Sequence, residues 1–159
     1  MQEVRSNDDP FRFTEKQRDA VLIPIIGAVD SDDLAIMDSG LALYAKNTVP
    51  NIQSFIGRFI RKYGNHAFYL GAHPVQTRPC IMLCAPYKAN MFEDPNLDII
   101  ETAMAEVVTL ANIHRLQNVY MPPIGSEDDT TFWTTDVKRR LITMLDDRFT
   151  IVLPEPRQM

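Results

Sequence analysis

The chain has 159 residues, of which 45% are hydrophobic and 23% are charged, and its formal net charge is −5. This composition is close to the globular average and is enough for one domain with its own core. The acidic balance gives no support for a protein that wraps a phosphate backbone, although a local basic patch is compatible with it. No apolar run approaches the ~20 residues of a membrane span and no signal-peptide pattern opens the sequence, so we expect a soluble, cytoplasmic protein.

Short apolar runs and helical periodicity alternate along the chain. The β-branched run 19–27 is typical of a strand buried on both faces, and Pro24 within it indicates a strand end or a bulge. Further runs predict strands at 67–70, 79–85, 119–121 and 149–153, and helices at 41–49, 52–63, 97–113 and 135–147. A turn is expected at 71–74. Strands that alternate with helices predict a single α/β domain with a mostly parallel central sheet and helices on both faces.

Two features outside this pattern bear on the organisation of the chain. Residues 1–10 are polar and unpatterned, so we expect a flexible arm ahead of a domain over residues 11–156. Cys80 and Cys84 lie four positions apart in one predicted strand. Their Cα atoms would then be ~13 Å apart, too far for a disulfide. We expect buried free thiols, as in a reducing compartment.

The polar loop 125–131 separates a buried strand from a helix. Thr134 or Thr135 is expected to cap that helix through its hydroxyl group. In an open α/β sheet, ligands bind at the carboxyl ends of the strands, and a helix amino terminus favours anions there. The polar loops 29–40 and 86–95 also follow predicted strands, so the three loops are expected to open on a common cleft. The alternative is an ordinary set of surface connections.

Few side chains in these loops have chemistry of their own. Lys88 follows a buried strand, and the acidic trio Glu127, Asp128 and Asp129 lies in another loop. A lysine between apolar walls attacks a sugar carbon when its pKa is depressed, and a carboxylate opposite acts as a general acid or base. The alternative is a solvated lysine and a solvated acidic loop. No metal-ligand spacing and no strict glycine-rich phosphate loop is present, so no metal or cofactor is expected.

Four segments resemble the macro domain, the ADP-ribose-recognising α/β module. Residues 19–24 are similar to its first buried strand, and residues 37–46 are similar to its glycine-containing loop and the helix that follows. Residues 86–88 are similar to its Pro-Thr-Lys motif, and residues 121–133 are similar to its phosphate loop, which ends in tryptophan. The nearest branch is that of the ADP-ribosyl glycohydrolases, which includes the terminal ADP-ribose hydrolase and the antitoxins that remove ADP-ribose from DNA. The resemblance covers residues 19–156.

The resemblance implies an ADP-ribose-type nucleotide or an ADP-ribosylated macromolecule as the partner, with nucleic acid only as a modified substrate and no membrane. In that branch the lysine after the proline attacks the distal ribose, and an aspartate in the last loop resolves the adduct. The matching positions here are Lys88 and Asp129. The ligand-binding residues that the resemblance implies are Asp38, Ser39, Gly40, Gly125, Ser126, Glu127, Asp128, Thr130 and Trp133.

The sequence also departs from the family pattern. The family's first strand ends in asparagines, which the run 23–27 lacks, and Arg12 lies near the position of the acid that holds adenine. The phosphate loop reads Gly-Ser-Glu-Asp-Asp-Thr-Thr rather than glycine-rich, and its carboxylates repel a diphosphate unless they turn away or a cation bridges them. Three hypotheses remain: an ADP-ribose binder, an ADP-ribosyl hydrolase, and an interaction or structural protein without the ligand. Such a small macro-like chain also suits a phage or mobile-element gene.

Overall fold

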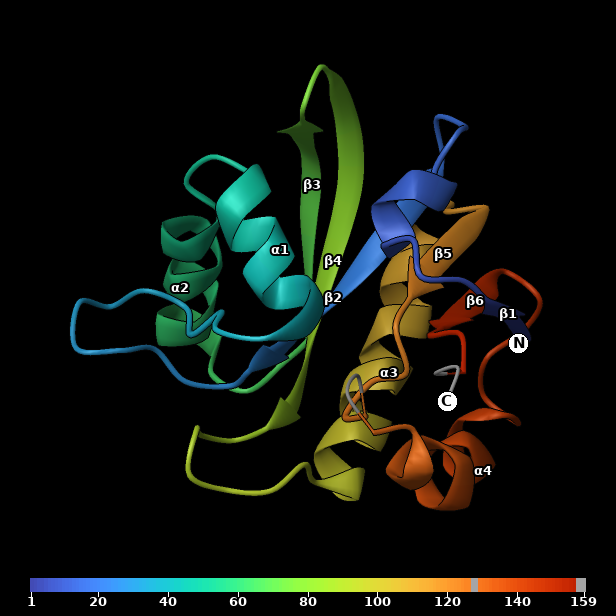
Figure 1. Cartoon of the computed structure of the whole chain (residues 1–159). Coiled ribbons are helices and arrows are strands. Elements are labelled where there is room, and N and C mark those ends of the chain that lie inside the picture. The colour runs from blue at the N-terminus through green and yellow to red at the C-terminus, as the bar shows by residue number, and fades with distance from the viewer. Residues whose placement is uncertain (127–128, 157–159) are drawn as a thin grey trace.

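The computed structural model describes residues 1–126 and 129–156. Within these residues six strands form one sheet in the order β1-β6-β5-β2-β4-β3 (Figure 1). The strands are β1 (Gln2–Arg5), β2 (Asp19–Ile26), β3 (Phe68–Val75), β4 (Arg78–Lys88), β5 (Asn118–Met121) and β6 (Phe149–Leu153). All neighbours pair in parallel except β3 and β4, which form an antiparallel hairpin. The predicted mostly parallel sheet is therefore confirmed.

Helices cover both faces of this sheet, as predicted (Figure 1). One face carries α1 (Gly40–Thr48) and α2 (Ile52–Tyr63), and the other carries α3 (Leu97–Ile113) and α4 (Lys138–Leu141). A 3-10 turn, η1 (Pro10–Phe13), precedes β2, and a π turn, η2 (Trp133–Val137), leads into α4. No helix in the described part of the chain is long and apolar enough to cross a membrane.

The two halves of the core meet across β2. Ala20 and Leu22 pack into the cluster beneath α3, whereas Val21 and Ile23 pack into the cluster beneath α1 and α2. Each such side chain contributes ~1.5–3 kcal/mol when it is buried. The ladder between β2 and β4 shifts after Ile25, next to Pro24, which matches the predicted bulge. The free thiols of Cys80 and Cys84 are buried, as predicted.

Two local predictions differ from the structure. The segment at 71–74 is not a turn but lies inside β3, where Gly71 has a φ of 77° and the ladder shifts between Tyr69 and Gly71. The positive φ marks a bulge, which only glycine adopts readily. Gln2–Arg5, expected in a flexible arm, instead forms β1 and pairs with β6. This strand depends on its partner, because its own side chains carry little apolar patterning.

The helical segment after the loop 125–131 begins earlier than predicted. The Asp129 Oδ1 atom accepts hydrogen bonds from the Thr131 N–H at 3.0 Å and the Thr131 hydroxyl at 2.6 Å, so Asp129 caps the first turn. Thr134 and Thr135 do not cap it, since their hydroxyl groups donate to the carbonyl groups four residues back. The helix predicted at 135–147 is instead the π turn η2 followed by the short α4.

Candidate functional site

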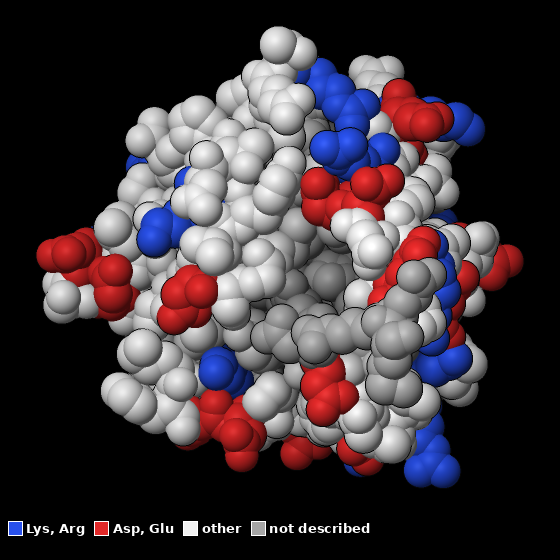
Figure 2. Space-filling view, in the orientation of Figure 1, with Lys and Arg blue, Asp and Glu red and all other residues white. Residues whose placement is uncertain are grey.

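A cavity of about 290 Å³ lies at the carboxyl edge of the sheet. It is lined by Ser39, Gly40, Tyr87, Lys88, Pro95, Gly125, Ser126 and Asp129. We call it the carboxyl-edge cavity. Figure 2 shows a hollow near the middle of this side of the molecule. The three polar loops predicted to share a cleft each contribute residues to the wall, because parallel strands bring their carboxyl ends to one edge.

Three other predicted ligand-binding residues, Asp38, Thr130 and Trp133, do not line this cavity. Asp38 is exposed just before the start of α1, and the Thr130 carbonyl accepts the hydrogen bond from the Thr134 hydroxyl group. Trp133 is 1% exposed and belongs to the core beneath α3, where its indole N–H has no hydrogen-bond partner among the described residues. The segment Glu127–Asp128 lies outside the described residues.

Lys88 is the last residue of β4 and is half-buried. Its ammonium nitrogen lies 5.6 Å from the centre of the Tyr87 ring, in a cation–π contact. Among the described residues, no carboxylate oxygen lies within 4.0 Å of this nitrogen. The lysine therefore presents a positive charge to the cavity without an ion-pair partner in the described part of the chain.

Asp129 stands at the mouth of the same cavity and is exposed. The hydrogen bonds from the Thr131 hydroxyl and N–H groups hold the pKa of this carboxyl below its usual range. Asp129 is therefore ionised at neutral pH. This state suits a proton acceptor and not a proton donor.

Gly125 and Ser126 form the wall that follows β5. Gly125 has a φ of 84°, and a Cβ atom there would lie 3.0 Å from the Ile100 Cδ1 atom. Ser126 is 5% exposed, and its hydroxyl group has no hydrogen-bond partner among the described residues. An unpartnered buried hydroxyl costs ~1–3 kcal/mol. A ligand atom in the cavity that bonds to this hydroxyl group would remove that cost.

The amino end of α1 completes the cavity. Ser39 stands at the N-cap position, but its side chain makes no capping hydrogen bond in the described structure. Gly40 follows with a φ of 56° and lines the cavity. The helix dipole is positive at this end. This wall therefore favours an anion, as Lys88 does.

Tyr87 and Pro95 were not predicted as site residues. They hold the ends of the loop 88–95, since the Asn96 N–H donates to the Tyr87 carbonyl at 2.8 Å. Asn96 also caps α3 by accepting from the Ile99 N–H at 3.1 Å. Only their positions in the sequence could have indicated that these two residues line the cavity, because Tyr87 adjoins Lys88 and Pro95 precedes the residue that caps α3. Among the described residues, no group of three or more His, Cys, Asp and Glu side chains is placed to hold a metal ion.

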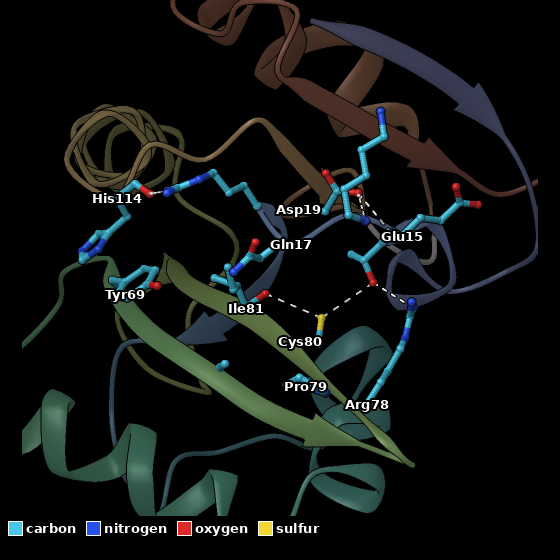
Figure 3. Close-up of a pocket in the computed structure, with 13 residues that line it drawn as sticks. Glu15, Gln17, Asp19, Tyr69, Arg78, Pro79, Cys80, Ile81 and His114 are labelled. Atoms are coloured by element: carbon cyan, nitrogen blue, oxygen red, sulfur yellow. Dashed lines mark hydrogen bonds between the residues drawn. The ribbon is translucent and has the colours of Figure 1, made fainter.

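A second cavity of about 480 Å³ lies at the opposite, amino edge of the sheet. Figure 3 shows Asp19 and Cys80 on two sides of it. Asp19 is 4% exposed and accepts hydrogen bonds from the Glu15 N–H at 3.1 Å, the Lys16 N–H at 3.0 Å and the Asn118 side chain at 2.8 Å. Its carboxylate thus fixes the turn that leads into β2. We call this the amino-edge cavity.

Two arginines of the amino-edge cavity are also used within the fold. Arg78 donates to the Phe11 carbonyl and to the Thr14 hydroxyl, both at 2.9 Å, and Arg18 donates to the His114 carbonyl at 3.2 Å. These bonds tie the segment before β2 to β4 and α3.

No protein-family model and no curated protein matches the sequence. Solved structures do match. The chain is similar to the macrodomain of Mycobacterium tuberculosis DarG, with a TM-score of 0.70 and 17% identity over 98% of this chain and 99% of that chain. It is similar to the macrodomain of Thermus aquaticus DarG, with a TM-score of 0.69 and 18% identity over 98% of this chain and 97% of that one.

A third similar structure is Thermosipho africanus DarTG in complex with ADP-ribose, with a TM-score of 0.66 and 15% identity. The match covers 99% of this chain but 43% of that one. At such identities the likeness shows the fold. The chain therefore has the macrodomain fold that the sequence resemblance implied.

Proposed function

We propose that this chain binds ADP-ribose or a related nucleotide in the carboxyl-edge cavity. The observation that carries the proposal is the meeting of three groups in one cavity: Lys88, the amino end of α1, and the Ser126 hydroxyl, which has no partner among the described residues. A diphosphate supplies the negative charge and the hydrogen-bond acceptors that this set of groups matches. The likeness to a structure solved with ADP-ribose supports the proposal. We also propose that the partners inside the cell are ADP-ribosylated macromolecules.

The size of the cavity indicates which part of the ligand enters it. At about 290 Å³ it lies at the lower end of the ~300–1,000 Å³ range of small-molecule sites. It suits the diphosphate and one adjoining ribose, with the rest of the nucleotide outside the walls described above. ADP and ribose 5-phosphate are therefore informative shorter probes.

Calorimetry with ADP-ribose, with and without Mg²⁺, tests the binding proposal. Lys88→Ala is expected to weaken binding about 10- to 150-fold, since it removes a charged contact worth ~1.5–3 kcal/mol. Lys46→Ala removes an exposed lysine from α1 and serves as the matched control, with no change expected. The absence of binding heat under both conditions would reject the proposal and leave the interaction-protein alternative.

The acidic loop offers an independent test of the same site. Replacement of Glu127 and Asp128 by glycine removes two negative charges from the sequence of this loop. If the loop faces the phosphates, the free energy of ADP-ribose binding is expected to become more favourable by ~1 kcal/mol or more. An affinity that is unchanged or lower in this double variant would mean that the loop does not face them.

A second candidate function, ADP-ribosyl hydrolysis, is favoured by the presence of Lys88 and Asp129 in the same cavity. In this scheme the neutral Lys88 amine bonds to the anomeric carbon of an ADP-ribosyl group, and the acceptor leaves with the electron pair and takes a proton from the lysine nitrogen. Water then adds to that carbon as Asp129 accepts its proton, and Asp129 passes this proton to the lysine nitrogen, which leaves as a neutral amine. The products are free ADP-ribose and the unmodified acceptor.

The contact between the Lys88 ammonium and the Tyr87 ring opposes this chemistry, because it must be given up before the nitrogen reaches the anomeric carbon. We therefore expect slow turnover. The test incubates ADP-ribosylated DNA and ADP-ribosylated glutamate peptides with the wild type, Lys88→Ala and Asp129→Asn. Asparagine still caps a helix, so the last variant keeps its fold. Release of ADP-ribose by the wild type alone would support hydrolysis, and equal release by all three would exclude this mechanism.

A further inference from the structure

Helix α2 carries a row of aromatic side chains along its outer side. Phe55, Phe59 and Tyr63 are spaced four residues apart, and their ring centres are separated by 5.4 Å and 6.4 Å. The inner side of the row packs against the edge strand β3, since Phe59 contacts Phe68 and Phe55 contacts His73. The outer side faces solvent, and Tyr63 is 53% exposed. The row is therefore anchored in the fold but not covered by it.

Two cations stand over this row. The Arg58 guanidinium lies 5.7 Å from the centre of the Phe55 ring, and the Lys62 ammonium lies 5.3 Å from the centre of the Tyr63 ring. Both cationic side chains are exposed. The rings and cations together line a shallow pocket of about 240 Å³ formed by Phe55, Arg58, Phe59, Lys62 and Tyr63. We call this surface the aromatic–basic face. It is locally basic on a chain whose net charge is −5.

The Tyr63 end of the aromatic–basic face adjoins the strand ends that build the carboxyl-edge cavity. Asn65 follows α2 closely, and its Oδ1 atom fills the space of the missing Gly27 side chain, 1.9 Å from where a Cβ atom would stand. The Gly27 N–H donates to the Lys88 carbonyl at 2.9 Å. A polymer on this face can therefore run directly past the carboxyl edge of the sheet.

We propose that the aromatic–basic face binds single-stranded nucleic acid. The exposed Tyr63 ring and the solvent-facing parts of the half-buried Phe55 and Phe59 rings offer stacking platforms to bases of any sequence, and the neighbouring cations match the phosphates. Residues four apart on a helix are separated by ~6 Å along its axis, whereas stacked bases in a duplex are ~3.4 Å apart. The row therefore fits bases that are spread along an extended single strand. An apolar peptide is disfavoured, because its binding would bury Arg58 and Lys62 without partners.

This proposal does not depend on ADP-ribose binding, and its test uses oligonucleotides without ADP-ribose. Fluorescence anisotropy is measured with a labelled 12-nucleotide oligothymidylate at about 50 mM salt, where phosphate contacts are strong. Arg58→Glu/Lys62→Glu is expected to weaken binding at least tenfold and to lower the salt dependence. Tyr63→Ala is expected to weaken it about fivefold, through lost stacking. The control Lys46→Glu/Arg139→Glu makes the same change in net charge at exposed positions elsewhere and is expected to lose less than twofold.

The alternatives give distinct results. Equal losses in both charge-reversal variants would overturn the proposal, because binding would then follow net charge alone. No binding by the wild type, or equal binding of a duplex of the same length, would also overturn it. Displacement of the oligonucleotide by polyglutamate at equal charge concentration would assign the face to acidic polypeptides instead. Thermal unfolding of each variant verifies the fold, and all the charge-reversed side chains are exposed.

Discussion

The two edges of the sheet use their polar groups in opposite ways. At the amino edge, the Asp19 carboxylate and the Arg78 guanidinium are both engaged in hydrogen bonds within the chain. At the carboxyl edge, the Ser126 hydroxyl has no partner among the described residues, and Lys88 has no ion pair there. Partnered polar groups stabilise a fold, whereas buried groups left unpartnered are expected where a ligand completes them. The comparison predicts that substitutions at the amino edge reduce stability and that those at the carboxyl edge reduce affinity.

The largest expected effect is the loss of the Asp19 carboxylate. Asp19→Ala removes three hydrogen bonds and leaves the Glu15 and Lys16 N–H groups without their acceptor. We expect the free energy of unfolding to fall by ~3 kcal/mol. Urea denaturation measures this change. Calorimetry below the unfolding transition should show the wild-type affinity for ADP-ribose, and a lower affinity would contradict the separation of the two edges.

The same carboxylate gives the stability a defined pH dependence. Burial alone would raise the pKa of Asp19, but the hydrogen bonds from Asn118, Glu15 and Lys16 outweigh it and hold the pKa below its usual value. The stabilisation is therefore complete above the unfolded pKa of ~3.9 and is lost as the pH falls through the lower folded value. Asp19→Asn should lose less stability in acid than the wild type does. Equal acid sensitivity of the two proteins would assign that sensitivity to other groups.

A smaller effect on stability is expected at Gly125. Gly125→Ala places a side chain at a φ of 84° and a Cβ atom 3.0 Å from Ile100. We expect the free energy of unfolding to fall by ~1–3 kcal/mol and ADP-ribose affinity to fall with it. Gly64 is the matched control, with a φ of 80° and no atom within 4 Å of its Cβ position. If Gly64→Ala destabilises the protein as much, backbone strain accounts for the whole effect.

Two buried hydroxyl groups provide the closest comparison between the edges. Thr14 and Ser126 are both 5% exposed, but among the described residues only the Thr14 hydroxyl has partners. It donates to the Phe11 carbonyl at 2.8 Å and accepts from Arg78 at 2.9 Å. Thr14→Val is expected to cost ~1–2 kcal/mol of stability. Ser126→Ala removes an unpartnered hydroxyl group, so it is expected to raise the free energy of unfolding by up to ~1–3 kcal/mol and to weaken ADP-ribose binding about fivefold. A large loss of stability in Ser126→Ala would show that its hydroxyl group is partnered within the fold.

The smallest effect concerns the two cysteines. Burial raises the pKa of both the Cys80 and Cys84 thiols, so neither forms the reactive thiolate at neutral pH. Both are expected to react with a thiol reagent in 6 M urea but not in native buffer over the same period. Cys80 also lines the amino-edge cavity. Rapid labelling of Cys80 in the native protein would show that this edge opens more than its hydrogen bonds imply.

Long periodic segments were predicted accurately from the sequence. The helices Ile52–Tyr63 and Leu97–Ile113 begin and end where the apolar spacing indicated, and the run at the start of the domain forms β2. Periodicity reports burial directly, so it succeeds where one face of an element meets the core. β1 was missed because its structure comes from pairing with β6. The bulge at Gly71 was mistaken for a turn, since both need glycine.

The location of the candidate site was predicted from the order of strands and loops, but the side chains that line its wall were not all predicted. Loops after parallel strands converge whatever their side chains are, which brought Lys88 and Gly125 to one cavity. The direction of each side chain depends on local geometry that the sequence does not reveal. The π turn η2 adds a residue to one helical turn and directs Trp133 into the core. Asp129 caps the same segment through one oxygen atom, a role that its sequence position did not indicate.

The parallel pairing of β1 with β6 has a consequence for the order of folding. Val4 lies opposite Val152, so the first strand of the chain finds its partner at the other end of the sequence. Closing so long a loop loses conformational entropy before any stabilising contact forms, and such distant pairings slow folding. During synthesis on the ribosome, residues 2–5 leave the exit tunnel early and wait unpaired until β6 emerges. The outer edge of the sheet is therefore the last part of this domain to form.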